Sequence, residues 1–207
     1  MQIEILNVQI VITYKHKKMK TILYFITILI SSVLFGQTVV QLNTPFNDIP
    51  DNGYVKDMLN QLNPFEGVWV YQQGSKKVTI KLEKLIYYNE SGRKKYYIDV
   101  INGRYKVENG STIVYSDYNE LMEAGDISGA VFWQGFYHLS YFDEKECWLL
   151  YNVKIKLDPN NSNRLIWEMG LDGMAAFDFE DECQRKYDSD WGTVSTLPVN
   201  MVLTRQP

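Results

Sequence analysis

The chain has 207 residues, of which 45% are hydrophobic and 14% aromatic, and its formal net charge at pH 7 is −4. The negative charge disfavours polyanions, so nucleic acid is not expected as a partner.

The first 36 residues have the pattern of a secretory signal peptide. An apolar segment, residues 21–35, is shorter than the ~20 residues that a membrane span needs, so we expect cleavage, with a retained signal anchor as the alternative. Met19 is the more ordinary start of such a segment, which makes residues 1–18 an over-long N-terminal extension. The basic region before the apolar segment consists of Lys15, Lys17, Lys18 and Lys20.

We therefore expect export to the periplasm, the cell surface or the medium. Cleavage after Gly36 leaves 171 residues with 17 basic and 24 acidic side chains, a net charge of −7. This length suits one domain, residues 37–207, with no further membrane span. Cys147 and Cys183 are the only cysteines, and in an oxidising compartment they predict one disulfide, which the loop-closure model values at about 4 kcal/mol. A nucleophilic role for Cys147 is the alternative.

Residues 54–62 predict a short helix. Val55, Met58, Leu59 and Leu62 recur at helical spacing, and such a helix could cover one end of the domain.

From Gly67 onward the pattern changes to the two-residue alternation of β-strands. Asn102-Gly103 and Asn109-Gly110 are both strong signals for tight hairpins. The turn dipeptides divide the region into about nine strands. The expected strands include residues 67–71, 78–83, 94–101, 104–108, 111–118, 131–141, 147–157, 164–169 and 199–205.

Nearly all of these strands follow one another through tight turns, and no helix is long enough for a parallel crossover. An all-β, antiparallel, up-and-down β-barrel is the fold class that follows, because closure removes exposed strand edges. A β-sandwich is the alternative.

Two parts of the chain resemble known families. The Gly-x-Trp of Gly67 and Trp69, with Arg205 near the end of the final strand, resembles the lipocalin pattern, in which a basic side chain packs over the indole of the first strand. That resemblance implies a lipocalin-like barrel with a Trp69–Arg205 latch. Residues 42–45, 49–50, 54–57 and 62–69, with 197–198 and 201–204, resemble an uncharacterised family of small exported proteins of Bacteroidota-type bacteria.

The chemistry visible in the sequence does not favour an enzyme. His138 is the only histidine after residue 36. It lies between Tyr137 and Leu139 in an expected strand, so its side chain should point away from theirs, to the outer surface. A Ser-His-Asp triad or a two-histidine metal site is therefore not expected. The acidic residues 178–182 are interpreted as a solvated loop, with a calcium site as the alternative. We expect no catalytic residue, no cofactor and no metal.

The sequence thus predicts an exported, non-catalytic protein that binds a small apolar or amphipathic ligand inside its barrel. A structural or protein-interaction module of the cell envelope with a filled barrel is the alternative, and an enzyme is the least favoured. The predicted ligand-binding interior comprises Trp69, Tyr71, Ile80, Leu82, Trp133, Tyr137, Leu149, Tyr151 and Trp167, with Val153 and Leu165 on the same faces.

Overall fold

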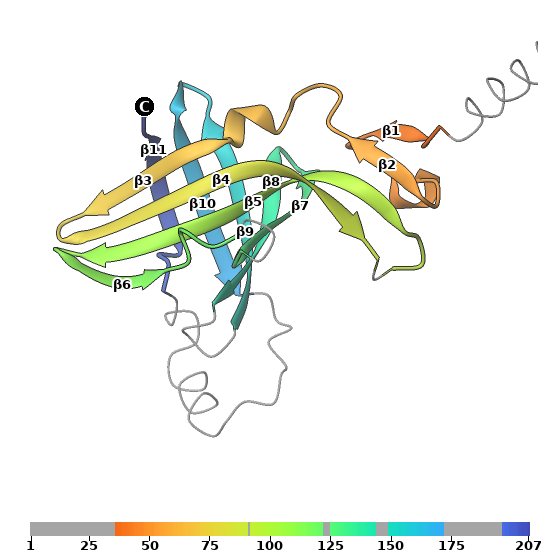
Figure 1. Ribbon diagram of the computed structural model, residues 1–207. Coiled ribbons are helices and arrows are strands. Elements are labelled where there is room, and N and C mark those ends of the chain that lie inside the picture. The colour runs from red at the N-terminus through yellow and green to blue at the C-terminus, as the bar shows by residue number, and fades with distance from the viewer. Residues whose placement is uncertain (1–35, 91, 122–124, 144–148, 172–195) are drawn as a thin grey trace, which may run out of the picture. The chain divides into compact units, whose positions relative to one another are not determined.

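Eight antiparallel strands form a closed barrel in the computed structural model (Figure 1). The model describes residues 36–90, 92–121, 125–143, 149–171 and 196–207. Around the barrel the strands follow the order β5, β4, β3, β11, β10, β9, β8 and β7, and β7 pairs again with β5. The predicted all-β, up-and-down barrel is therefore confirmed, and the β-sandwich alternative is not what forms.

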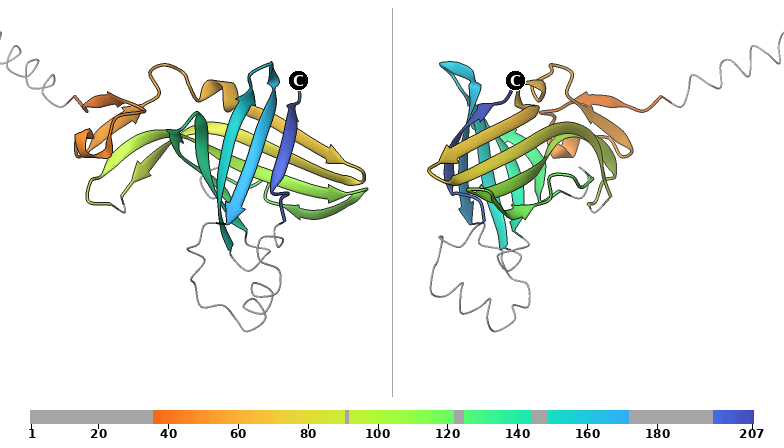
Figure 2. Two further views of the ribbon diagram at one scale, coloured as in Figure 1. Left: turned by 180° about the vertical axis from the view of Figure 1, so that it is seen from behind. Right: turned by 60° about the vertical axis from the view of Figure 1, so that its left-hand side comes forward.

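The strands of the barrel differ in length, and β4 and β5 are the longest. Seen from behind, β8 to β11 form one wall in front of β3, β4 and β5, and the core lies between these walls (Figure 2). The barrel strands are β3 Gly67–Gln73, β4 Lys76–Asn89, β5 Tyr96–Asn109, β7 Ile127–Trp133, β8 Phe136–Asp143, β9 Leu149–Asp158, β10 Asn161–Leu171 and β11 Asn200–Arg205. A short strand, β6 Thr112–Ser116, pairs with the end of β5 after a turn at Gly110, as Asn109-Gly110 predicted.

The contact between β5 and β7 depends on glycine. Gly103 is paired with Ile127, and a Cβ at Gly103 would lie 2.9 Å from Leu82 and 3.0 Å from Ile127. A Cβ at Gly129 would lie only 2.4 Å from the backbone oxygen of Ile101. The predicted hairpin at Asn102-Gly103 is wrong, because this glycine serves close strand approach within the continuous strand β5 rather than a turn.

Beyond the barrel, the first residues of β5 pair with β4 on one side and with an N-terminal extension on the other (Figure 1). This extension contains β1 Val39–Gln41 and β2 Gly53–Lys56, which run parallel to each other, and β2 also runs parallel to β5. Its two helices are single 3₁₀ turns, η1 Phe46–Asp48 and η2 Asn63–Phe65. Within the ranges given above, no helix is long and apolar enough to cross a membrane.

The predicted helix over residues 54–62 is wrong, since residues up to Lys56 belong to β2 and a turn follows. Met58 and Leu59 are 49% and 64% exposed, so the apolar residues at helical spacing do not share one buried face. The backbone is held by Asp57, whose carboxylate accepts hydrogen bonds from the N–H groups of Gln61 and Leu62. This side-chain bonding competes with helix formation.

Most of the predicted interior is buried. Among the described side chains of that set, Trp133 alone is exposed, at 58%, and it lies on the outer face of β7. Trp133 was expected to share the face of Tyr137, but the chain turns between them, and the residue opposite the inward-facing Tyr137 is Phe132, which leaves Trp133 facing outward. The long strand expected over residues 131–141 is also wrong, since Gln134 and Gly135 both have positive φ and form a tight turn there.

Several expectations fall outside the described residues. They concern the signal peptide, of which only Gly36 is described, the disulfide between Cys147 and Cys183, and the acidic residues 178–182.

Candidate functional site

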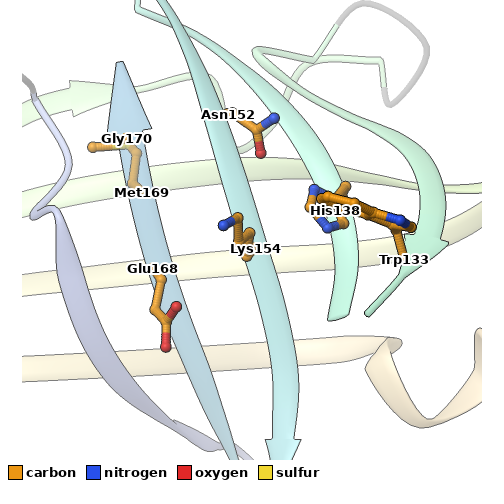
Figure 3. A pocket seen from close by; sticks show the side chains of 7 residues that line it. All are labelled: Trp133, His138, Asn152, Lys154, Glu168, Met169 and Gly170. Carbon is orange, nitrogen blue, oxygen red and sulfur yellow. The ribbon is translucent and has the colours of Figure 1, made fainter. Parts of the chain in front are cut away.

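A groove of about 530 Å³ lies on the outer surface of the wall formed by β8, β9 and β10 (Figure 3). Its volume is within the range of about 300–1,000 Å³ typical of small-molecule sites. The side chains of His138, Asn152, Lys154 and Glu168 stand on the face of these strands that points away from the core, because the residues between them are buried. The groove is lined by Trp133, His138, Asn152, Lys154, Glu168, Met169 and Gly170.

Trp133 and His138 form the aromatic side of the groove. Trp133 is the last residue of β7, and the tight turn that follows brings it beside His138 on β8, with ring centroids 5.6 Å apart and planes tilted by 54°. The indole covers the imidazole, so His138 is only 8% exposed. The prediction for His138 was therefore right about the face of the strand and wrong about its exposure.

The imidazole of His138 has no hydrogen-bond or ion-pair partner among the described residues. The His138 nitrogens are not among the fully buried polar atoms that lack a partner, so they are open to the solvent in the groove. A ligand in the groove could hydrogen-bond to them in place of water. His138 is the residue of the groove that most directly indicates binding.

A polar row crosses the groove from strand to strand. Lys154 is the register partner of both His138 and Glu168, so these three side chains follow one another across β8, β9 and β10. Figure 3 shows Glu168 and the Trp133–His138 pair on opposite sides of Lys154. In the part of the chain that the structure describes, the side chains of Asn152, Lys154 and Glu168 form no hydrogen bond or ion pair. One cation, one anion and one amide are thus available to a small molecule.

The backbone at Gly170 forms an open part of the groove. A Cβ built at Gly170 would meet no atom within 4 Å, and the glycine does not have a positive φ. Any larger residue could therefore be accommodated by the fold, yet its side chain would project into the space that a ligand would use.

The predicted interior residues lie elsewhere, in the barrel core. Tyr71 is partly buried and packs against this core. Leu149 begins β9, and its side chain is outside what the structure describes. The remaining predicted residues, at most 3% exposed, are Trp69, Ile80, Leu82, Tyr137, Tyr151, Val153, Leu165 and Trp167. The structure thus brings the predicted set together inside the barrel and separates Trp133 from it.

The expected latch geometry is present. The guanidinium carbon of Arg205 lies 4.3 Å from the ring centroid of Trp69. Arg205 also donates hydrogen bonds to the carbonyl oxygens of Glu66 and Pro64, which ties β11 to the start of β3. Gly67 is needed here, because its φ is +131° and a Cβ would lie 2.9 Å from Arg205 Nη1.

Sequence reasoning did not find the groove. Its residues come from three strands, and only correct strand pairing places Lys154 and Glu168 near His138. One local signal was available, since Gln134-Gly135 is a turn dipeptide. If these two residues are taken as a hairpin turn, Trp133 and Tyr137 lie on different strands and their side chains point to opposite faces of the sheet.

Comparison with known proteins gives a family but no relative of known activity. The chain matches no curated protein, and it matches no solved structure. A family model does match residues 17–206, which cover the barrel strands, the Trp69–Arg205 latch and every groove residue. The chain therefore belongs to the family of unknown function DUF6705.

Proposed function

We propose that this protein is an exported, non-catalytic binding protein that holds a small amphipathic molecule in its outer groove. The proposal moves the expected ligand from the barrel interior to the outer face. Trp69, Trp167, Tyr105, Tyr137 and Tyr141 are each at most 1% exposed, so large aromatic side chains occupy much of the space between the walls. The groove, in contrast, offers about 530 Å³ next to an exposed indole.

The observation that carries the proposal is the environment of His138. This side chain is 8% exposed, lines the groove, and has no polar partner among the described residues. Its nitrogens are open to the groove, so they can hydrogen-bond to a small molecule held beside the Trp133 indole.

The arrangement of polar groups supports binding rather than catalysis. His138 and Glu168 stand two strands apart, about 9.5 Å between backbones, with Lys154 between them. A histidine and a carboxylate that act together in catalysis need hydrogen-bond contact. Burial also raises the pKa of Tyr105, Tyr137 and Tyr141 in the barrel core, so these hydroxyls are not poised to act as bases at neutral pH.

Export is supported by the sequence of residues 15–35, where lysines precede an apolar segment. The proposed location is the periplasm, the cell surface or the medium.

The test compares molecules retained by two forms of the full chain. Wild type and Gly170→Leu are each incubated with small-molecule extract of the native host and its medium, and retained molecules are identified by mass spectrometry. We expect at least one molecule to be enriched on wild type and lost from Gly170→Leu, because the leucine side chain fills the groove. Equal retention by both forms would place binding outside the groove.

If wild type retains nothing, an interaction module becomes the better function. The observation that favours it is a patch of exposed apolar side chains on one face of the distal ends of β4 and β5, formed by Ile86, Tyr88 and Tyr97.

A further inference from the structure

The geometry points to a neutral carbohydrate as the molecule that the outer groove binds. This inference rests on the proposed function and names the chemical class of its ligand. Three features of the groove carry it: a fixed and exposed indole, polar groups of both kinds with no partner, and an open stretch of backbone.

Trp133 provides a stacking surface. Its indole is 58% exposed, yet its contact with the His138 ring restrains it. The face of an aromatic ring is electron-rich and attracts weakly positive C–H groups. One face of a pyranose ring presents several such C–H groups, and its hydroxyls project around the edge. An exposed and restrained tryptophan is therefore suited to pack against a sugar ring.

The polar groups beside Trp133 match hydroxyls. Lys154 only donates hydrogen bonds, ionised Glu168 only accepts them, and Asn152 does both. Since each sugar hydroxyl can donate and accept, a single ring can satisfy all three side chains and His138. Lys154 and Glu168 cancel in charge, which disfavours a strongly charged ligand.

An acyl chain fits the groove less well than a sugar. Trp133 is the one large exposed apolar side chain among the lining residues, because Met169 is only 5% exposed. A fatty acid would place most of its methylene groups against Asn152, Lys154 and Glu168, where burial would leave these groups without hydrogen bonds.

The size of the groove favours more than one sugar unit. Its volume of about 530 Å³ exceeds that of a single pyranose ring. Gly170 leaves open space along β10, where a second ring could lie against the backbone. A short oligosaccharide, or the end of a longer glycan, fits these dimensions.

The experiment measures binding of neutral oligosaccharides by isothermal titration calorimetry, using the full chain as exported. The probes are trimers of glucose with α- or β-linkage, N-acetylglucosamine, mannose, galactose and xylose. At least one trimer should bind, Trp133→Ala should weaken its affinity at least tenfold, and Gly170→Leu should abolish binding. Trp133→Phe retains an aromatic face and should bind more tightly than Trp133→Ala.

Tyr87→Ala is the matched control, because Tyr87 is an exposed aromatic residue on β4 and not part of the groove. It should leave sugar affinity unchanged. Sugar binding that survives both Trp133→Ala and Gly170→Leu would overturn the inference.

Two further probes separate this inference from the proposed function. Lauric acid and adenosine are titrated against wild type and Gly170→Leu. One outcome is that no sugar binds, while lauric acid or adenosine binds to wild type and not to Gly170→Leu. In that case the carbohydrate inference is wrong and the proposed function of the groove stands. If neither the sugars nor these probes bind, and no host molecule is retained, both are wrong.

Discussion

The two faces of the wall formed by β8, β9 and β10 are built from the same strands but carry opposite kinds of side chain. On the inner face, Tyr137, Tyr151 and Trp167 are at most 3% exposed. The Tyr137 hydroxyl accepts a hydrogen bond from the backbone N–H of Ile101 at 3.1 Å. On the outer face, Lys154 and Glu168 have no side-chain partner among the described residues.

This difference separates stability from binding. Packed and hydrogen-bonded groups lower the free energy of the folded chain, so the inner face holds the barrel together. Groups left without partners contribute little to stability, but they remain available to another molecule. Mutations on one face should therefore change the free energy of unfolding, and mutations on the other should change ligand affinity.

The largest expected effect is the loss of an inner tryptophan. Trp167→Ala should lower the free energy of unfolding by about 3–5 kcal/mol, because it removes a large buried ring and leaves a cavity. Trp133→Ala, the matched change on the outer face, should alter it by less than about 0.5 kcal/mol. Urea unfolding followed by circular dichroism measures both.

Similar losses for the two tryptophans would contradict the separation of the faces. Trp167→Phe sharpens the test, since the indole N–H of Trp167 has no hydrogen-bond partner among the described residues. It should cost less than Trp167→Ala, because the phenyl ring keeps most of the packing and removes the unpaired donor.

The next largest loss of stability is expected where the backbones of β5 and β7 lie close together, at Gly129. Gly129→Ala places a Cβ 2.4 Å from the Ile101 oxygen and from the Tyr137 hydroxyl, so the strands must move apart. We expect a loss of about 2–3 kcal/mol in the free energy of unfolding, measured by thermal and urea denaturation. Gly170→Ala, where no atom lies within 4 Å, should stay within about 0.5 kcal/mol of wild type. The prediction fails if the two alanine variants are equally stable.

A smaller loss is expected at the latch. Arg205→Ala removes the cation over the Trp69 ring and two hydrogen bonds to backbone carbonyls, at a cost of about 1–2 kcal/mol. Arg164→Ala is the control, because Arg164 is 47% exposed and makes a surface ion pair with Asp158 at 3.4 Å. Differential scanning calorimetry should show a lower Tm for Arg205→Ala alone. A Tm shift of equal size in both variants would refute a stabilising role for the latch.

The smallest effect is a pH dependence at Asp117. Burial raises the pKa of Asp117, outweighing the lowering by its hydrogen bond from the Tyr105 N–H and by the Arg104 guanidinium 3.4 Å away. A carboxyl whose pKa is higher in the folded state binds its proton more tightly there. Its contribution to stability is thus greatest below the unfolded pKa of about 3.9 and is lost as the pH rises through the folded value.

Asp117→Asn removes this titration and keeps an oxygen for the Tyr105 N–H. The stability of wild type minus that of Asp117→Asn should therefore fall as the pH rises from about 3 to about 7. Urea titrations across that range measure the difference, and a difference that rises with pH would show that the pKa is lowered instead.

The sequence was informative where a single strand carried the whole pattern. Alternation predicted the inner positions of Ile80, Leu82, Val153 and Leu165, and all four are buried. The resemblance of Gly67, Trp69 and Arg205 to the lipocalin pattern likewise implied which two strands meet.

The sequence was not informative where strand pairing decides which face of the sheet a side chain points to. The turn at Gln134 and Gly135 puts Phe132, not Trp133, on the face of Tyr137, and alternation alone does not show where one strand ends and the next begins. The groove required both this turn and the register of β8, β9 and β10. Likewise, Gly103 looked like a turn residue because the sequence does not show which strand approaches it.

The pairing of β3 with β11 has a consequence for biogenesis. These neighbours are the first and the last barrel strands along the chain, so the ring cannot close until Asn200–Arg205 has been synthesised. Until then, β3 and β10 each present an unpaired backbone edge, which is a template for aggregation. Contacts between segments so distant in sequence also form slowly. A nascent chain is therefore most prone to aggregation just before its last strand emerges. A stop codon ahead of Asn200 would yield an open sheet with unpaired edges instead of a smaller barrel.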